Sequence, residues 1–265
     1  MIKVKDICLL IEEFAPLSYQ ESYDNSGLIF GNQETQLTGV LICLDISEPV
    51  IDEAISLGYN MIVSHHPLIF RGIKNLTGNG HVETCLIKAI KHGIAIYGGH
   101  TNVDSVINGV NGKIAEKLGL VNIEILAPDH IESGKTEQHG LGIIGKLSTP
   151  VEEKEFLELV KKTFSCHTLR HSSLIGKCVE RVAVCGGSGS EFITNAKKAG
   201  ATVFLTGESS FHEYFTEGMG IVLVDAGHYE TEQYTKELFF ELISKKIPTF
   251  ALRISTEEQN PVHYF

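Results

Sequence analysis

Three apolar segments of this chain stop where side chains of metal-binding type begin. These side chains are His65 and His66 after the first segment, His100 and Asp104 after the second, and His228 and Glu232 after the third. In open α/β folds, ligands bind beyond the carboxyl ends of the strands. We therefore expect the three segment ends to build one site from distant parts of the chain. Imidazole and carboxylate groups without thiolate suit Zn, Fe, Mn, Ni or Co.

The adjacent pair His65 and His66 is the strongest signal. Neighbouring side chains of a strand point to opposite faces, but the backbone can turn at a strand end, so the pair could serve two metal ions lying side by side. Pro67 follows and removes a backbone donor, which ends a strand. The competing interpretation is a buried histidine pair with satisfied hydrogen bonds. Agreement with two other strand ends favours metal binding.

His228 and Glu232 are four residues apart, so both lie on one face if a helix starts here. They could bind one metal ion, or the carboxylate could bridge two. Asp104 is a third candidate ligand, although capping a helix or turn is a common role for aspartate. His100 could be a ligand or could orient one.

Glu208 and His212 are also four residues apart. They could transfer protons beside the metal ions, or they could orient the ligands. We predict Glu208 and His100 as the catalytic proton-transfer residues. The Gly-rich run 186–190 could hold an anion, but it lacks the lysine of a phosphate-binding loop. No G-x-S-x-G motif is present, so a serine nucleophile of that type is not expected.

Composition narrows the function classes. The chain has 265 residues and a net charge of −11, so binding to a nucleic-acid backbone is not expected. The six cysteines form no C-x-x-C pair, which predicts buried, reduced thiols in a cytoplasmic protein. We expect no signal peptide and no membrane span.

Strand and helix patterns alternate, which predicts an α/β fold. We predict helices at 3–14, 48–57, 82–92, 111–118 and 152–163, and strands at 40–44 and 59–63. A shift of 142 residues places 40–66 on 182–208 without a gap, which predicts an internal repeat. The competing interpretation is that any two α/β units share such spacing, but the polar strand ends match as well as the apolar pattern. A shorter shift places Gly99-His100 on Gly227-His228. We therefore predict two similar, duplicated domains, 1–125 and 126–265, facing each other around a metal cleft.

The sequence resembles the Nif-three-like dinuclear metal-centre proteins, known as GTP cyclohydrolase I type 2 homologues. The matching stretches cover nearly the whole chain: Tyr23-Asp24-Asn25-Ser26-Gly27-Leu28, residues 64–70, residues 100–104, Thr206-Gly207-Glu208, residues 227–232 and Asn260-Pro261-Val262. Two positions depart from the family pattern: Tyr23 stands where relatives usually have Trp, and Ile143 stands where relatives often have Arg.

The resemblance implies a site with two divalent metal ions, held by His65, His66, Asp104, His228 and Glu232. It also implies two similar α/β domains and a toroidal homohexamer. From these residues we expect a metal-dependent hydrolase of a nucleotide- or pterin-like small molecule, of cyclohydrolase or phosphoesterase type. The alternative is a non-catalytic ring that binds metal ions or partners. An open coordination position on the metal would distinguish the two.

Overall fold

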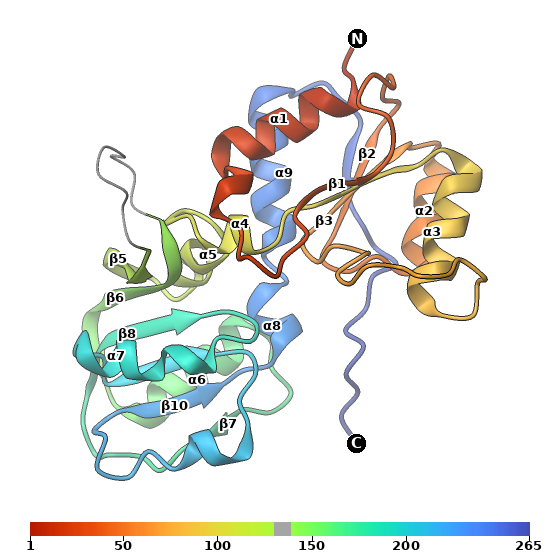
Figure 1. Cartoon of the computed structure of the whole chain (residues 1–265). Helices are drawn as coiled ribbons and strands as arrows, with labels where there is room; N and C mark the ends of the chain where they lie inside the picture. The colour runs from red at the N-terminus through yellow and green to blue at the C-terminus, as the bar shows by residue number, and fades with distance from the viewer. Residues whose placement is uncertain (130–138) are drawn as a thin grey trace. The chain divides into compact units, whose positions relative to one another are not determined.

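A computed structural model describes residues 1–129 and 139–265 (Figure 1). The chain divides into two compact units. The first contains 1–103 and 235–263, and the second contains 104–234 and 264–265. The boundary that we predicted at residue 125 falls inside a strand, Leu120–Pro128. The first unit is therefore built from two separate lengths of chain, because the chain returns to it after residue 234.

The first unit contains one sheet in the described residues. Its strands are β1 (Gly27–Phe30), β2 (Val40–Cys43), β3 (Met61–Ser64), β4 (Ala95–Gly98) and β11 (Leu252–Ile254). The strand order is β1-β4-β3-β2-β11. β11, β2, β3 and β4 run parallel, and β1 pairs antiparallel with β4 at one edge. Every residue of β2, β3 and β4 is buried, as expected for parallel strands that are covered on both faces.

Helices cover this sheet on both sides. They are α1 (Val4–Phe14), η1 (Leu17–Tyr19), α2 (Glu48–Leu57), α3 (His81–His92) and α9 (Thr235–Lys246). α1 packs on α9 and α2 packs on α3, and Figure 1 shows the two pairs on opposite faces of the sheet. α2 and α3 end at Gly58 and Gly93, which have left-handed backbones with φ of 68° and 62°. Glycine adopts this conformation without steric cost, so the predicted helix ends are confirmed.

The second unit is built on a mixed sheet. Its strands are β5 (Leu120–Pro128), β6 (Gly140–Val151), β7 (Arg170–His171), β8 (Val179–Cys185), β9 (Val203–Thr206) and β10 (Val222–Asp225). Its helices are α5 (Val110–Lys117), α6 (Glu153–Thr163), η2 (Ser190–Phe192), α7 (Ile193–Lys198), η3 (Phe211–Tyr214) and α8 (His228–Glu232), and α4 (Thr101–Asp104) spans the point where the units join. The strand order is β5-β6-β8-β9-β10-β7. β8, β9 and β10 are parallel.

The internal repeat is confirmed by the strand register. Val40 pairs with Met61 in the first sheet, and Val182 pairs with Val203 in the second. Each residue is shifted by the predicted 142 positions. An antiparallel edge strand follows in both sheets, β1 beside β4 and β7 beside β10. The duplicated α/β fold is thus confirmed, whereas a cleft between the two units stays a prediction.

The later part of the repeat differs by one residue from the predicted alignment. Gly98 pairs with Ser64, and Asp225 pairs with Thr206, so this strand is shifted by 127 positions. His100 then corresponds to Gly227, not to His228. His228 is the first residue of α8, whereas His100 precedes the helix that starts at Thr101. The two histidines reach their positions by different turns.

Five of the six cysteines are buried and all six are free thiols. Cys178 is exposed and departs from the expectation of buried thiols, because it lies just before β8 begins. In the part of the chain that the structure describes, no helix has the length and apolar character needed to cross a membrane.

Candidate metal centre

Three histidines of the first unit form a cluster. His65 and His66 directly follow β3, and His100 follows β4 by two residues. β3 and β4 are adjacent and parallel, so their carboxyl ends lie at the same edge of the sheet. The ring centroids are 4.9 Å apart for His65 and His66, 5.3 Å for His65 and His100, and 5.5 Å for His66 and His100. One nitrogen from each ring lies within 4.8 Å of the others, which allows a shared metal ion.

Each ring of this cluster is held through its Nδ1 atom. The Nδ1 of His65 is 2.9 Å from the carbonyl oxygen of Gly99. The Nδ1 of His66 is 2.8 Å from the Oδ1 of Asp45, and the Nδ1 of His100 is 2.7 Å from the Oδ1 of Asp24. Metal-binding histidines are commonly oriented by a carbonyl or carboxylate on the other ring nitrogen. This pattern is the one expected of rings that bind a metal ion through Nε2.

The surroundings of Asp24, next to His100, favour its ionised form. Its side chain is fully buried, and burial alone raises the pKa of a carboxyl group. Hydrogen bonds from His100, Thr101 and Ser26 outweigh this, so the pKa of Asp24 lies well below its usual range. Thr101 donates both its backbone N–H, at 3.0 Å, and its hydroxyl. A buried carboxylate is thereby fixed beside the imidazole.

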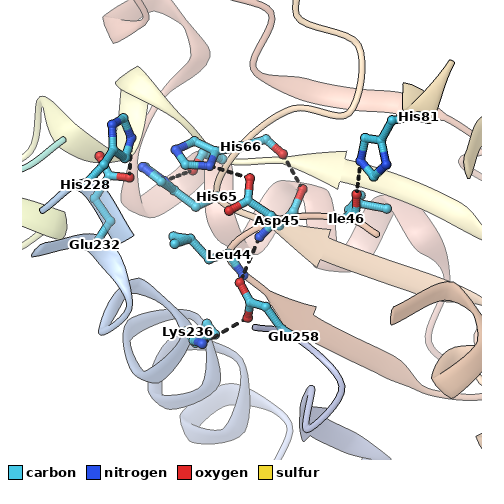
Figure 2. Close-up of polar contacts among 12 residues, drawn as sticks. Leu44, Asp45, Ile46, His65, His66, His81, His228, Glu232, Lys236 and Glu258 are labelled. Carbon is cyan, nitrogen blue, oxygen red and sulfur yellow. Dashed lines mark hydrogen bonds and ion pairs between the residues drawn. The ribbon is translucent and has the colours of Figure 1, made fainter. Parts of the chain in front are cut away.

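Asp45 is supported in turn by the end of the chain. The Oε1 of Glu258 accepts hydrogen bonds from the backbone N–H groups of Leu44 and Asp45, both at 3.0 Å. Lys236 pairs with the other oxygen of this carboxylate at 2.9 Å. Figure 2 shows the series from Lys236 through Glu258 and Asp45 to His66. The loop after β2 is thus held in the conformation that points Asp45 at His66.

The second unit also carries a histidine and a carboxylate that face each other. His228 and Glu232 face each other one turn apart on α8, with Nε2 and Oε2 3.0 Å apart (Figure 2). Glu232 is buried, with 4% of its surface exposed. The Nδ1 of His228 is 3.2 Å from the Oε2 of Glu208. The predicted i, i+4 arrangement is therefore present, and Glu208 orients the ring.

A glycine makes room for this pair. A Cβ atom at Gly187 would lie 2.1 Å from the Oε1 of Glu232 and 3.2 Å from the Nε2 of His228. The φ of Gly187 is +58°, in the left-handed region that favours glycine. The Gly-rich run after β8, which we considered as an anion loop, thus serves the close approach of the Glu232 carboxylate.

The remaining predicted site residues lie as follows. Asp104 ends α4 and begins the second unit, where its carbonyl oxygen accepts a hydrogen bond from Asn111 at 3.2 Å. Its role as a ligand stays a prediction. His212 is exposed and stacks on Phe215, with ring centroids 6.3 Å apart. The hydrogen bond to His228 gives Glu208 an orienting role, and its predicted proton transfer stays a prediction.

Asp24 and Asp45 were not singled out by the sequence. The signal for Asp45 was available, because it follows the buried strand β2 as the histidines follow β3. Asp24 follows no strand, and only the fold brings it to His100. The chemistry of the combined donor set fits a divalent metal ion, since imidazoles backed by carboxylates and a carbonyl are typical of such sites. In the described residues, the candidate ligand groups consist of histidines and a glutamate and contain no cysteine.

Comparison with known proteins agrees with these observations. A family model described as Duf34/NIF3 (NGG1p interacting factor 3) matches residues 2–261. The chain belongs to the DUF34/NIF3 family. A protein named GTP cyclohydrolase 1 type 2 homolog from Clostridium acetobutylicum is 36% identical over 233 residues, which cover 87% of this chain and 85% of the relative. Its namesake from Lactococcus lactis is 32% identical and covers 99% of both chains.

Solved structures share the fold of this chain. A Bacillus cereus protein related to NIF3 has a TM-score of 0.89 and 26% identity, covering 100% of this chain and 99% of the other. Reduced HcgD from Methanocaldococcus jannaschii has a TM-score of 0.78 and 30% identity, covering 96% and 97%. The family resemblance predicted from the sequence is thus confirmed across the whole chain.

Proposed function

We propose that this DUF34/NIF3 chain binds two divalent metal ions and uses them to hydrolyse a nucleotide- or pterin-like small molecule. The observation that carries the proposal is the cluster of His65, His66 and His100, in which every ring is held through Nδ1. One nitrogen from each of these rings lies within 4.8 Å of the others, which suits a shared metal ion. The names of the curated relatives support a cyclohydrolase-type reaction for them.

The ligands in this proposal come from both units. His65, His66 and His100 would bind from the first unit, and Asp104, His228 and Glu232 from the second. Bound divalent ions supply Lewis acidity and lower the pKa of water. The protein side chains provide the rest: Asp24 and Asp45 keep two imidazoles in the tautomer that presents Nε2, and Glu208 does so for His228. The metal identity follows from availability as well as ligand type.

A second candidate function is metal binding without catalysis. The structure gives one specific reason to keep it. Both residues predicted for proton transfer already contact other candidate site residues: Glu208 contacts His228, and His100 belongs to the histidine cluster. A hydrolase needs an acid or base that reaches the substrate. A ring that stores, delivers or senses metal ions needs none.

The first experiment measures metal content in freshly purified protein and in the His66→Ala variant. His92→Ala is the matched control, because His92 is exposed at the end of α3. We expect about two ions per chain in the native protein and in the control, with clear loss in His66→Ala. A screen of nucleotides and pterins for turnover that EDTA abolishes then separates the two functions. An apoprotein that takes up no metal after reconstitution would contradict both.

We also propose that the chain assembles as a homohexamer in the cytoplasm. The family resemblance supports the assembly, and five buried free thiols suit a reducing compartment. Light scattering coupled to size exclusion tests it, because a monomer of 29.1 kDa and a ring of six differ greatly in mass. A monomeric mass at micromolar concentration would contradict this assembly.

A further inference from the structure

A cavity of about 590 Å³ lies in the loop between β3 and α3 of the first unit. Its lining includes Pro67, which directly follows His66, and residues from 68 to 83. Pockets for small molecules commonly have volumes of about 300–1,000 Å³. The loop therefore forms a hollow of ligand size that begins one residue from the histidine cluster.

The charge of this hollow is opposite to that of the chain. Arg71 and Lys74 line it and are exposed, although the chain as a whole has a net charge of −11. Neither forms an ion pair with a carboxylate in the described residues. Two cations within four residues, left available to solvent, are suited to an anionic group. Arginine in particular binds phosphate with two parallel hydrogen bonds.

Glu83, the acidic residue of the lining, is hydrogen-bonded to the backbone of its own loop. Glu83 accepts hydrogen bonds from the backbone N–H groups of Thr77 at 2.7 Å and Gly78 at 2.8 Å. These bonds, with the one from the Thr77 hydroxyl, lower the pKa of its carboxyl group. The carboxylate thus fixes the loop against the start of α3, and its charge is balanced by backbone donors instead of by Arg71 or Lys74.

An aromatic side chain connects the hollow to the histidines. Phe70 lines the hollow and is 43% exposed. Its ring stands edge-on to His100, with centroids 5.8 Å apart, and it also contacts Tyr23 at 6.4 Å. Ile73 adds a second exposed apolar surface. A flat ring lying against Phe70 would have its anionic group near Arg71 and Lys74 and its other edge toward His100.

We propose that this hollow is the binding site for the substrate, and that the substrate class is a phosphorylated compound carrying a flat ring. This inference rests on the proposed function, because the histidine cluster supplies the reacting end. Arg71 and Lys74 bind the phosphate, and Phe70 and Ile73 contact the ring. The site adds a specificity that metal ligands alone do not provide.

The test uses metal-stripped full-length protein, so that binding at the hollow is measured apart from metal chemistry. Guanosine monophosphate, ribose 5-phosphate and guanosine are titrated calorimetrically at low ionic strength. The variant is Arg71→Gln with Lys74→Gln. The control is Lys161→Gln with Lys162→Gln, which removes the same charge from exposed positions of α6. Circular dichroism confirms that both fold.

We expect guanosine monophosphate to bind more tightly than either fragment. Its Kd should rise about tenfold or more in the Arg71 and Lys74 variant, because charge-assisted contacts to phosphate are lost, and stay within about twofold in the control. Equal Kd values in both variants, or no binding of the phosphate at about 1 mM, would overturn the proposal. Metal content of the same variants separates the two ideas. If the Arg71 and Lys74 variant keeps its metal and loses phosphate binding, both the phosphate site and the metal-dependent function are supported. If the protein binds the phosphate and takes up no metal, the metal-dependent function is contradicted and the phosphate site is not.

Discussion

The two halves of the repeat have the same strand register and different residues just beyond it. Cys43 pairs with Ser64 in the first sheet, and Cys185 pairs with Thr206 in the second. The next positions are His65 and His66 in the first half, where the second half has Gly207 and Glu208. A duplicated backbone therefore positions imidazoles on one side and a glycine and a carboxylate on the other.

Positions 45 and 187 explain how the halves diverged. Asp45 holds His66 through its Nδ1 atom. The equivalent residue in the repeat is Gly187, and the space of a side chain there is filled by the carboxylate of Glu232. The first half thus presents its candidate ligands from the strand ends. The second half presents its candidate ligands from α8, and the carboxylate just after its strand β9, Glu208, orients His228. The two halves of the repeat therefore place their donor groups in two different ways.

The largest expected effect is the loss of metal binding when a carboxylate that orients a histidine is removed. Asp45→Ala should weaken metal binding about 10–100-fold, since losing an orienting carboxylate costs that much in known sites. Glu208→Ala should weaken metal binding about tenfold at most. The contact of Glu208 to His228 is 3.2 Å, whereas that of Asp45 to His66 is 2.8 Å, and the side chain of Glu208 is 62% exposed, whereas that of Asp45 is 45% exposed. Competition with a fluorescent chelator measures both. Equal losses would show that the halves contribute alike.

The second prediction fills the space that Glu232 occupies. Gly187→Ala should lower stability by about 1–2 kcal/mol from left-handed backbone strain, and it should also weaken metal binding, because the buried carboxylate must move away from His228. Gly200→Ala is the control, since φ is +80° there and nothing lies within 4 Å of the added Cβ. Denaturant unfolding and metal titration measure the two effects. Weakened metal binding in both variants would contradict this explanation.

The third prediction concerns a smaller difference between the halves, Glu53 against its equivalent Asn195. Burial would raise the pKa of Glu53, but hydrogen bonds from Ser255 and Thr256 lower it below its ordinary value. A lowered folded-state pKa adds stability above the unfolded value and loses it as the pH falls through the folded value. Glu53→Gln should therefore cost about 1–2 kcal/mol at pH 7 and progressively less below about pH 4.

Denaturant unfolding at pH 7 and at several values below 4 measures the Glu53 effect. Asn195→Asp is the reciprocal variant, which places a carboxylate in the second half without the C-terminal donors. It should not reproduce the pH dependence. A Glu53→Gln penalty that is constant over the whole pH range would sink the assignment to an ionised carboxylate.

The smallest expected difference between the halves concerns the reactivity of their buried cysteines. Burial raises the pKa of Cys43 and Cys185, at equivalent strand positions, and raises that of Cys8 and Cys166 to about 12 and of Cys85 to about 11. Only the thiolate reacts with alkylating agents. Cys178 is exposed, although its hydrogen bond to Glu152 raises the pKa of its thiol. Iodoacetamide at pH 7.5 should therefore label Cys178 slowly and alone in the native protein, and all six cysteines after unfolding. Native labelling of Cys43 or Cys185, located by peptide mass mapping, would contradict the burial.

Periodicity and strand-end chemistry predicted much of this molecule. The helices and buried strands, the duplication and the clustering of His65 and His66 with His100 follow from apolar patterns and from the rule that parallel strands end at one edge. Features that depend on distant parts of the chain could not be predicted in that way. Asp24 reaches His100 only through the fold, and β11 adds to the first sheet from beyond residue 250. The strand register, which the sequence does not print, places His228 one residue away from the position predicted for it in the repeat.

The return of the chain to the first unit has a consequence for synthesis on the ribosome. Domains fold as units while the chain emerges, but the first unit lacks β11, α9 and Glu258 until residues 104–234 of the second unit have been made. Residues 104–234 can therefore fold before the first unit is complete. Since Glu258 holds the backbone of Asp45, the histidine cluster is among the last features to become ordered. A chain that stops prematurely after residue 234 would carry His65, His66 and His100 without the support that orients them.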